Sequence, residues 1–321
     1  MQHAYRWKTF KYAGPQLECK TLSPLHFPLL SKAGIGRAVT SSDLDCFEHS
    51  PRLCTFSSRT IPRSNILCNQ IEHLKLHGRL RSLAGLAKVF RSCPSLKSLE
   101  ATDIQTYGAG LEQGTLGTWR NITSLAFADC SLQNMFSSFN FPSLNKLVIE
   151  DHLHCTVWPV DALISFISRS SCVITSLTLH MQSLSDSDLI ACLQVMPELL
   201  HLDIANSCYQ EHNSITSHLL SSLTQQQSTS ISLVPKLHSL SLHNEIADFN
   251  DHAFIRMVES RWFKPGSDVS TAMSTMGRAC IHSVVLKCER REVDAEIYEP
   301  LWILDAEGLR VVVSGTNGVQ V

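Results

Sequence analysis

The chain of 321 residues is long enough for about two ordinary domains or for one elongated repeat array, at roughly 150 residues per domain. Apolar residues make up 44% of it and charged residues only 17%, which provides for a continuous core and argues against wholesale disorder. Lys and Arg number 27 against 29 Asp and Glu, a net charge of −2. This balance predicts neither a nucleic-acid partner nor an anionic membrane surface.

The N-terminal residues MQHAYRWKTF mix polar and aromatic side chains and lack the apolar centre of a signal peptide. No stretch approaches the ~20 apolar residues of a transmembrane helix. The 12 cysteines include no Cys-x-x-Cys pair, and several stand beside apolar residues, as small buried side chains do. We therefore expect an intracellular protein, of cytoplasm or nucleus, with free thiols and no membrane partner.

A unit of the form Pro-x-apolar-x-x-apolar-x-apolar recurs along the chain and is plainest at Pro142–Ile149 (PSLNKLVI). There are ten such units, and five of the nine spacings between them fall within the 20–29 residues typical of leucine-rich repeats. Half of the 12 prolines open a unit: Pro28, Pro51, Pro94, Pro142, Pro197 and Pro235.

The last three positions of each unit alternate, which predicts a short strand with one buried face. A proline just before such a strand ends any preceding helix and requires no N–H in the ladder. In chain order we expect strands near residues 30–35, 53–58, 71–76, 96–101, 122–127, 144–149, 174–179, 199–204, 237–242 and 281–286.

Helical segments lead into several of these units. Ser185–Asp188 is a capping-box-like start for one of them, and Pro197 ends it. We expect helices over Ser82–Ser92, Val160–Ser170, Leu189–Met196 and Ile215–Gln225. One strand plus one helix, repeated, predicts an α/β leucine-rich-repeat solenoid, a curved horseshoe with a parallel sheet on the concave face and helices on the convex face. We expect a single domain over residues 1–321 with a C-terminal cap at 294–321.

Four parts of the chain together resemble a known family. Tyr5-Arg6-Trp7-Lys8 resembles an Arg-Trp element, and Met257–Trp262 (MVESRW) resembles a helix ending in Ser-Arg-Trp. The proline-leucine repeats lie between them, and Glu307–Val313 (EGLRVVV) resembles a final helix and strand. These features resemble the leucine-rich-repeat portion of fungal F-box proteins of the basidiomycete type.

The resemblance implies a non-enzymatic protein-interaction scaffold, the substrate-recognition region of an F-box protein in a Skp1–cullin–F-box ubiquitin ligase. The F-box would precede the Arg-Trp element, but only five residues precede Arg6. We therefore expect a Skp1-type adaptor to bind only if a longer form carries an F-box. The regular Asn after the strand is also missing, since Cys130 stands at its place and Asn206 and Asn244 stand one position early. The alternative is a free-standing leucine-rich-repeat scaffold with no ubiquitin link.

The solvent-facing positions of the strands are the candidate binding site for a protein of unknown identity, because the concave face is the usual ligand face of such solenoids. These positions are rich in serine, nearly uncharged and poor in the aromatic residues that dominate binding hot spots, so a merely solvated face is the alternative. The candidate partner-binding residues are His73, Lys75, Ser98, Glu100, Ser124, Lys146, Ser176, Thr178, His201, Asp203, Ser239 and Ser241.

The sequence predicts no enzyme, metal or cofactor. Asp151–Cys155 (DHLHC) lacks the fourth ligand of a zinc site. Gly108, Gly110 and Gly114 depart by one residue from a dinucleotide-binding loop, and no Gly-x-Ser-x-Gly elbow occurs. We expect Trp262 to pack as part of the C-terminal cap rather than to anchor a partner.

Overall fold

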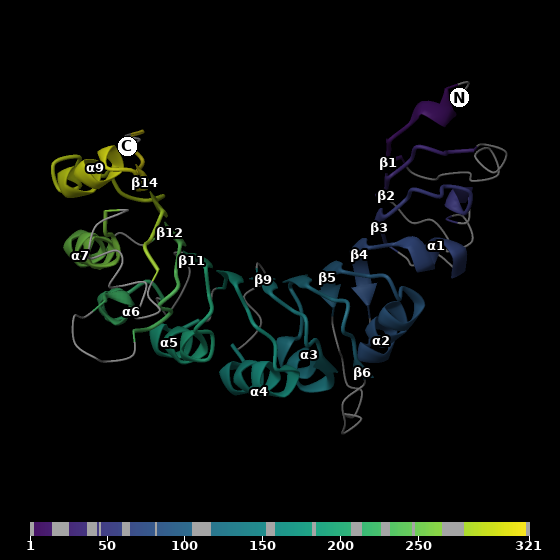
Figure 1. The fold of residues 1–321 in the computed structure, drawn as a ribbon, viewed down its shortest axis with the longest axis horizontal. Helices are drawn as coiled ribbons and strands as arrows, with labels where there is room; N and C mark the ends of the chain where they lie inside the picture. The colour runs from purple at the N-terminus through teal and green to yellow at the C-terminus, as the bar shows by residue number, and fades with distance from the viewer. Residues whose placement is uncertain are drawn as a thin grey trace. The chain divides into compact units, whose positions relative to one another are not determined.

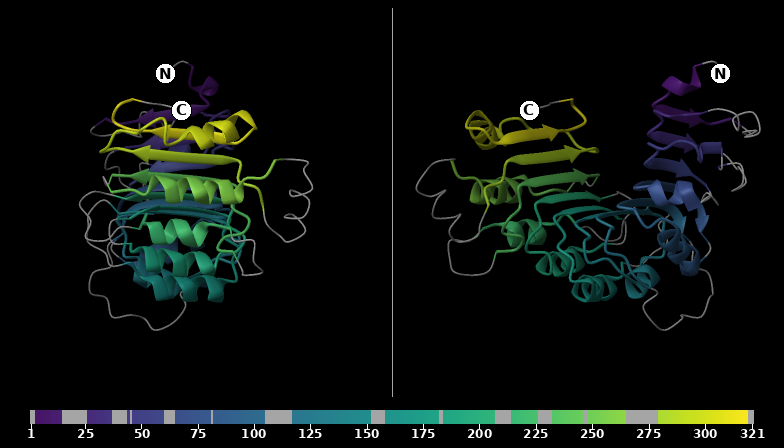
Figure 2. Two further views of the ribbon diagram at one scale, coloured as in Figure 1. Left: turned by 90° about the vertical axis from the view of Figure 1, so that its left-hand side faces the viewer. Right: turned by 45° about the vertical axis from the view of Figure 1, so that its right-hand side comes forward.

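The computed structural model describes residues 3–14, 26–36, 44, 46–59, 65–80, 82–104, 117–151, 158–181, 184–206, 214–225, 232–245, 248–264 and 279–318. The chain divides into two compact units, an N-terminal unit of Met1–Leu144 with Ser168–Cys172 and a C-terminal unit of Asn145–Ile167 with Val173–Val321. Each unit consists of a layer of strands with helices along one face (Figures 1 and 2).

Twelve strands of the described residues form one parallel sheet, in the order β1-β2-β3-β4-β5-β7-β9-β10-β11-β12-β13-β14. The N-terminal unit holds β1 (Thr9–Tyr12), β2 (Lys32–Ile35), β3 (Thr55–Ser58), β4 (His73–Leu80), β5 (Ser98–Ile104) and β7 (Ser124–Ala128). The C-terminal unit holds β9 (Lys146–Glu150), β10 (Ser176–His180), β11 (His201–Asn206), β12 (Ser239–Asn244), β13 (Ser283–Cys288) and β14 (Arg310–Ser314). Two short strands, β6 (Gly117–Thr118) and β8 (Phe139–Asn140), form a separate pair.

The same pattern of backbone hydrogen bonds occurs at the start of successive strands. Two consecutive N–H groups at the start of a strand donate to one carbonyl just before the preceding strand, as His238 and Ser239 do to the Leu200 carbonyl, at 2.8 and 3.0 Å. The other acceptors are the carbonyls of Lys8, Ser31, Cys54, Glu72, Lys97, Asn145, Thr175 and His238. The repeat in the sequence is therefore a repeat of backbone hydrogen bonding.

An observed strand lies in each of the ten segments where the sequence predicts one. Each strand begins two residues later than the first apolar residue of its unit, since Leu96 lies before β5 and Leu199 before β11. Those first apolar residues are nevertheless fully buried. Two strands of the twelve-stranded sheet lie outside the ten segments, β1 near the start of the chain and β14 within the predicted C-terminal cap, as does the separate pair β6 and β8.

The prolines occupy a turn, which explains the offset. In the turn Cys93–Leu96, the Leu96 N–H donates to the Cys93 carbonyl at 3.1 Å, with Pro94 at the second position. Proline suits that position because its φ is already near the value the turn requires. The same bond closes the turns that contain Pro28, Pro51, Pro142, Pro197 and Pro235. The proline column therefore marks the turn that precedes the strand, and the leucine closes that turn.

The eight α-helices of the described residues are α1 (Asn65–Gln70), α2 (Leu83–Ser92), α3 (Leu132–Ser138), α4 (Val160–Ser170), α5 (Asp186–Gln194), α6 (Ser217–Leu223), α7 (Asp251–Arg261) and α9 (Glu299–Ala306). A short 3-10 helix, Ala4–Arg6, precedes β1. Side-chain oxygens cap α2, α5, α6 and α7 at Ser82, Ser185, Thr216 and Asn250, which satisfies N–H groups of the first turn. None of the described helices is long and apolar enough to cross a membrane.

Two arginines tie helices to the preceding repeat. In the C-terminal unit, the fully buried Arg261 at the end of α7 donates to the carbonyls of Leu223, Leu233 and Val234 at 2.6, 2.7 and 3.1 Å. In the N-terminal unit, Arg169 donates to the Asn140 side chain at 2.7 Å and to the carbonyls of Phe136 and Phe139. Each guanidinium thus satisfies carbonyls that the end of a helix or a loop leaves without helical partners.

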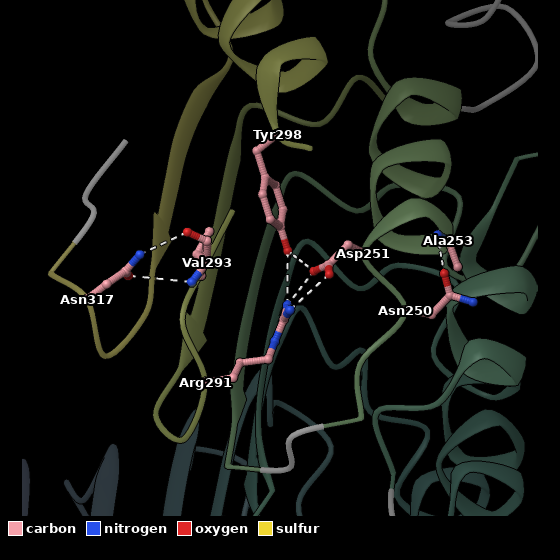
Figure 3. Close-up of polar contacts among 7 residues, drawn as sticks. All are labelled: Asn250, Asp251, Ala253, Arg291, Val293, Tyr298 and Asn317. Carbon is pink, nitrogen blue, oxygen red and sulfur yellow. Dashed lines mark hydrogen bonds and ion pairs between the residues drawn. The ribbon is translucent and has the colours of Figure 1, made fainter. Parts of the chain in front are cut away.

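The predicted cap region 294–321 contains α9 and β14. An ion pair and a tyrosine fasten the preceding loop to α7. Asp251, in the first turn of α7, binds Arg291 through both carboxylate oxygens, and the Tyr298 hydroxyl donates to the same carboxylate (Figure 3). The Asn317 side chain exchanges two hydrogen bonds with the Val293 backbone, at 2.9 and 3.4 Å. Trp262 is half-buried, and its ring tip approaches the Gly308 backbone.

Candidate functional site

The face of the strands opposite the helices, here the sheet face, carries the outward side chains of every strand in aligned rows. In the N-terminal unit one row runs Thr9, Lys32, Thr55, His73, Ser98 and Ser124, and the next runs Lys11, Gly34, Ser57, Lys75, Glu100 and Ala126. In the C-terminal unit the corresponding rows are Lys146, Ser176, His201, Ser239, Ser283 and Arg310, then Val148, Thr178, Asp203, Ser241, Val285 and Val312. All twelve candidate residues from the sequence lie in these rows.

A third row of outward side chains lies two residues further along the strands than the second row. It contains His77 and Thr102 in the N-terminal unit, and Glu150, His180, Ala205, His243, Lys287 and Ser314 in the C-terminal unit. The candidate set omitted these residues because the apolar triad ends one position earlier. Extending the period-two alternation past the triad would have found them.

Hydrogen bonds and an ion pair join neighbouring strands on the face of the N-terminal unit. Lys75 forms an ion pair with Glu100, which lies opposite it on β5. The Ser57 hydroxyl lies 3.1 Å from His77 Nε2, across from β3 to β4. These contacts fix side chains near the middle of the face.

Asp203 is the centre of a polar cluster on the face of the C-terminal unit. Its Oδ1 lies 3.6 Å from His180 Nε2 on one neighbouring strand and 3.7 Å from His243 Nε2 on the other. His180 Nδ1 lies 3.9 Å from Glu150, and the Ser241 hydroxyl lies 3.0 Å from His243 Nε2. The cluster therefore extends over the four strands β9–β12.

The carboxylate sets the protonation of this cluster. Interaction with Asp203 raises the pKa of His180, and burial opposes it only in part. Burial lowers the pKa of His243, although Asp203 works in the opposite direction. Burial alone would raise the pKa of Asp203, but the two imidazoles outweigh it and hold that pKa below its usual value. Asp203 therefore favours the protonated form of His180, whereas burial favours the neutral form of His243.

Ser241, His243 and Asp203 are the residue types of a hydrolytic triad, but their geometry differs from one. In a triad the serine and the carboxylate contact opposite nitrogens of the imidazole. Here Ser241 Oγ and Asp203 Oδ1 both approach His243 Nε2, at 3.0 and 3.7 Å. The arrangement therefore lacks a carboxylate that orients the imidazole of His243 from its other nitrogen.

The net charge of −2 is the sum of two opposite charges. The N-terminal unit contains 17 Lys and Arg against 9 Asp and Glu, a net charge of +8. The C-terminal unit contains 10 Lys and Arg against 20 Asp and Glu, a net charge of −10. The near-neutral composition of the whole chain conceals this division.

Within the described residues, no group of three or more His, Cys, Asp and Glu is placed to hold a metal ion. None of the nine described cysteines forms a disulfide, and burial raises the pKa of the Cys172 and Cys192 thiols to about 11 and about 12. Residues 152–155 and the three glycines at 108, 110 and 114 lie outside the described residues.

Two open hollows lie beside the helices of the C-terminal unit rather than on its sheet face. One, of about 320 Å³, lies among residues of α5 and α6 and of the segments that follow these helices, including Pro197 and Pro235. The other, of about 620 Å³, lies at the first turns of α5, α6 and α7, where Asp186, Asp248 and Asp251 contribute carboxylates. Neither contains residues of the sheet-face rows.

The chain matches no model of a known protein family, and no curated protein matches it. The likeness of its repeats to those of F-box proteins therefore stays a prediction.

Proposed function

We propose that this chain is a non-enzymatic protein-interaction scaffold of the leucine-rich-repeat solenoid class, which binds a partner protein on its sheet face. The observation that carries the proposal is the sheet face itself. Twelve parallel strands present aligned rows of side chains that are mostly small, polar and accessible. Helices cover the opposite face, and the Ser241–His243–Asp203 arrangement lacks catalytic geometry. A repetitive face of partly exposed residues suits an extended protein ligand better than a small molecule, which requires an enclosed pocket.

Site-specific photocrosslinking tests this proposal. A benzophenone amino acid replaces Ser98 in the N-terminal unit or Ser176 in the C-terminal unit, both on the sheet face. Lys88 on α2 and Gln194 on α5 are the matched positions on the helix side, and both are exposed. We expect the sheet-face positions to crosslink one defined protein, which then binds the purified chain. Crosslinks that arise mainly from the helix-side positions would contradict the proposal.

We further propose, from the resemblance of the repeats, that the partner is a substrate of a Skp1–cullin–F-box ubiquitin ligase. The test is whether the captured partner becomes ubiquitinated by a form of the protein that includes an F-box and binds a Skp1-type adaptor. We expect residues 1–321 alone to bind the partner but not the adaptor. A partner that binds but is never ubiquitinated would favour the alternative, a free-standing scaffold with no ubiquitin link.

A further inference from the structure

The sheet face of the N-terminal unit carries four cationic side chains, one from each of the strands β1, β2 and β4 and one from the residue just after β3. Lys11 lies on β1, Lys32 on β2 and Lys75 on β4, and Arg59 directly follows β3. Lys11, Lys32 and Arg59 are exposed, and Lys75 is half-exposed. Adjacent strands of a sheet lie about 4.8 Å apart, so the four cations extend over roughly 14 Å.

The register of the strands places these cations around an uncharged floor. Lys11 is opposite Gly34, and Gly34 is opposite Ser57. A side chain at Gly34 would meet only Ser57 and the Lys11 stem, at 3.7 and 3.9 Å, so the backbone there is accessible between its neighbours. Lys32 is opposite Thr9 on one side and Thr55 on the other. The cations thus surround small side chains and bare backbone.

Within the residues that the structure describes, only one of these four cations has an acidic partner. Lys75 has Glu100 as its partner. Lys11, Lys32 and Arg59 form no ion pair in the part of the chain that the structure describes. Their surroundings are also basic, because the unit as a whole carries +8.

His77 experiences the positive electrostatic potential of two of these cations. It lies on the same face, and its pKa is lowered first by burial and then by the charges of Lys75 and Arg59, against the opposing effect of Glu100. The charges of Lys75 and Arg59 thus act on another side chain of the same face.

We propose that the sheet face of the N-terminal unit binds an Asp- and Glu-rich, extended segment of a partner protein, with Lys11, Lys32 and Arg59 as its anion-binding residues. This rests on the proposed function and specifies the chemistry of the partner. In an extended segment, alternate side chains lie roughly 6.8 Å apart. Lys11 and Lys32 are diagonal neighbours on parallel strands, and their Cα atoms lie roughly 8 Å apart at the usual strand spacing, so their flexible side chains can reach carboxylates at this spacing. Small residues between the carboxylates fit over Gly34 and Ser57.

The composition of the face favours a protein segment over a single-stranded nucleic acid. Nucleic-acid surfaces of that kind combine cations with aromatic rings on which bases stack. The described outward positions of β1–β5 and β7 contain Lys, Arg, His, Ser, Thr, Gly, Ala and Glu but no Phe, Tyr or Trp.

The test measures binding of a fluorescent peptide of alternating Asp and Ser residues to the full chain by anisotropy. The Asn-Ser peptide of equal length is the uncharged control. The variant Lys11→Glu/Lys32→Glu/Arg59→Glu reverses the charge at the three proposed anion-binding positions. The matched variant Lys88→Glu/Arg91→Glu/Arg120→Glu makes the same change of net charge at three exposed positions of the same unit that lie outside the sheet-face rows.

We expect the first variant to weaken binding of the Asp-Ser peptide by about 10- to 100-fold and the matched variant by less than about 3-fold. Binding should also weaken as salt rises past about 0.1 M, where the screening length falls to roughly 10 Å. Equal losses in the two variants would overturn the proposal, since only net charge would then matter. Absence of binding by the wild-type chain, or tighter binding of a single-stranded oligonucleotide of equal charge, would overturn it as well.

A second copy of this chain is the other acidic occupant to test, because the C-terminal unit carries −10. Sedimentation of the wild-type chain at rising concentration, with and without the peptide, distinguishes the two. In one outcome the wild-type chain self-associates, the peptide disperses the oligomer and the first variant abolishes it. In that case the occupant of the face is a second copy of this chain and not a segment of another protein. If the peptide fails to bind while crosslinks still form at Ser176, the scaffold proposal stands and only its acidic chemistry fails.

Discussion

Asp251 in the first turn of α7 and Arg291 in the loop after β13 form a two-point ion pair that is largely shielded from solvent, with 13% and 19% of their side chains exposed (Figure 3). The buried Tyr298 hydroxyl donates to the same carboxylate. Burial, with the nearby Asp251, raises the pKa of Tyr298, so its hydroxyl stays protonated as a donor over the physiological range. The three residues together hold the segment before α9 against α7.

We predict that Asp251→Asn destabilises the protein by about 1–3 kcal/mol, because the substitution leaves the Arg291 guanidinium shielded from water without its counter-charge. Urea unfolding measures the change. Asp248→Asn is the control, since Asp248 lies three residues away and is exposed. Equal stability of the two variants would show that the ion pair does not fasten the cap.

Arg261 presents a different situation, a buried cation that donates hydrogen bonds to three backbone carbonyls. We predict that Arg261→Met costs about 2–4 kcal/mol, since the apolar chain fills much of the space but leaves carbonyls unsatisfied. Arg256→Met on the same helix should change the free energy of unfolding by less than about 0.5 kcal/mol, because Arg256 is exposed. A small effect at Arg261 would mean that water replaces the guanidinium without penalty.

The positions of the strands could be predicted from the sequence because burial and period-two alternation act on the same residues. The first residue of each strand could not be predicted, because burial does not distinguish the turn from the strand. Leu96 in the turn is as fully buried as Leu99 in β5. β1 follows the same rule, with Trp7, Phe10 and Tyr12 at the three apolar positions. The sequence pattern does not predict this strand, because the pattern is defined mainly on aliphatic residues and these three are aromatic. For the candidate site, the first two rows followed from the triad, whereas the contacts of His180 and His243 depend on the pairing of strands far apart in sequence.

The turn before β5 predicts different costs for two of its residues, the proline and the leucine that closes it. Pro94→Ala should destabilise the protein by only about 0.4–1 kcal/mol, since proline mainly limits the conformations of the unfolded chain. Leu96→Ala should cost about 2–5 kcal/mol, because it opens a cavity at a residue only 1% exposed. Ser95→Ala, between them, is the control for changes to the turn itself. A larger effect at Pro94 than at Leu96 would contradict the role assigned to the proline column.

The histidines beside Asp203 predict a pH dependence that can be measured residue by residue. His180 has a raised pKa, so its stabilising contribution is complete below about pH 6.5 and is lost as the pH rises through the folded-state value. Asp203 has a lowered pKa, so its contribution is present above about pH 4 and is lost as the pH falls through the folded-state value. The pair therefore stabilises the fold most between about pH 4 and 6.5. His243, with a lowered pKa, acts in the opposite sense and favours the fold as the pH rises.

We predict that Asp203→Asn lowers the pKa of both His180 and His243, because each loses the carboxylate that favours its protonated form. NMR titration of the imidazole resonances measures both values in one sample. Glu198→Gln is the control, since Glu198 pairs with Lys236 at 2.6 Å, away from either histidine. The associated change in stability should stay below about 1 kcal/mol, because exposed pairs are screened by solvent and His180 and Asp203 keep 31% and 36% of their side chains exposed. If His180 titrates unchanged in Asp203→Asn, then Glu150, 3.9 Å from its other nitrogen, is the carboxylate that governs it.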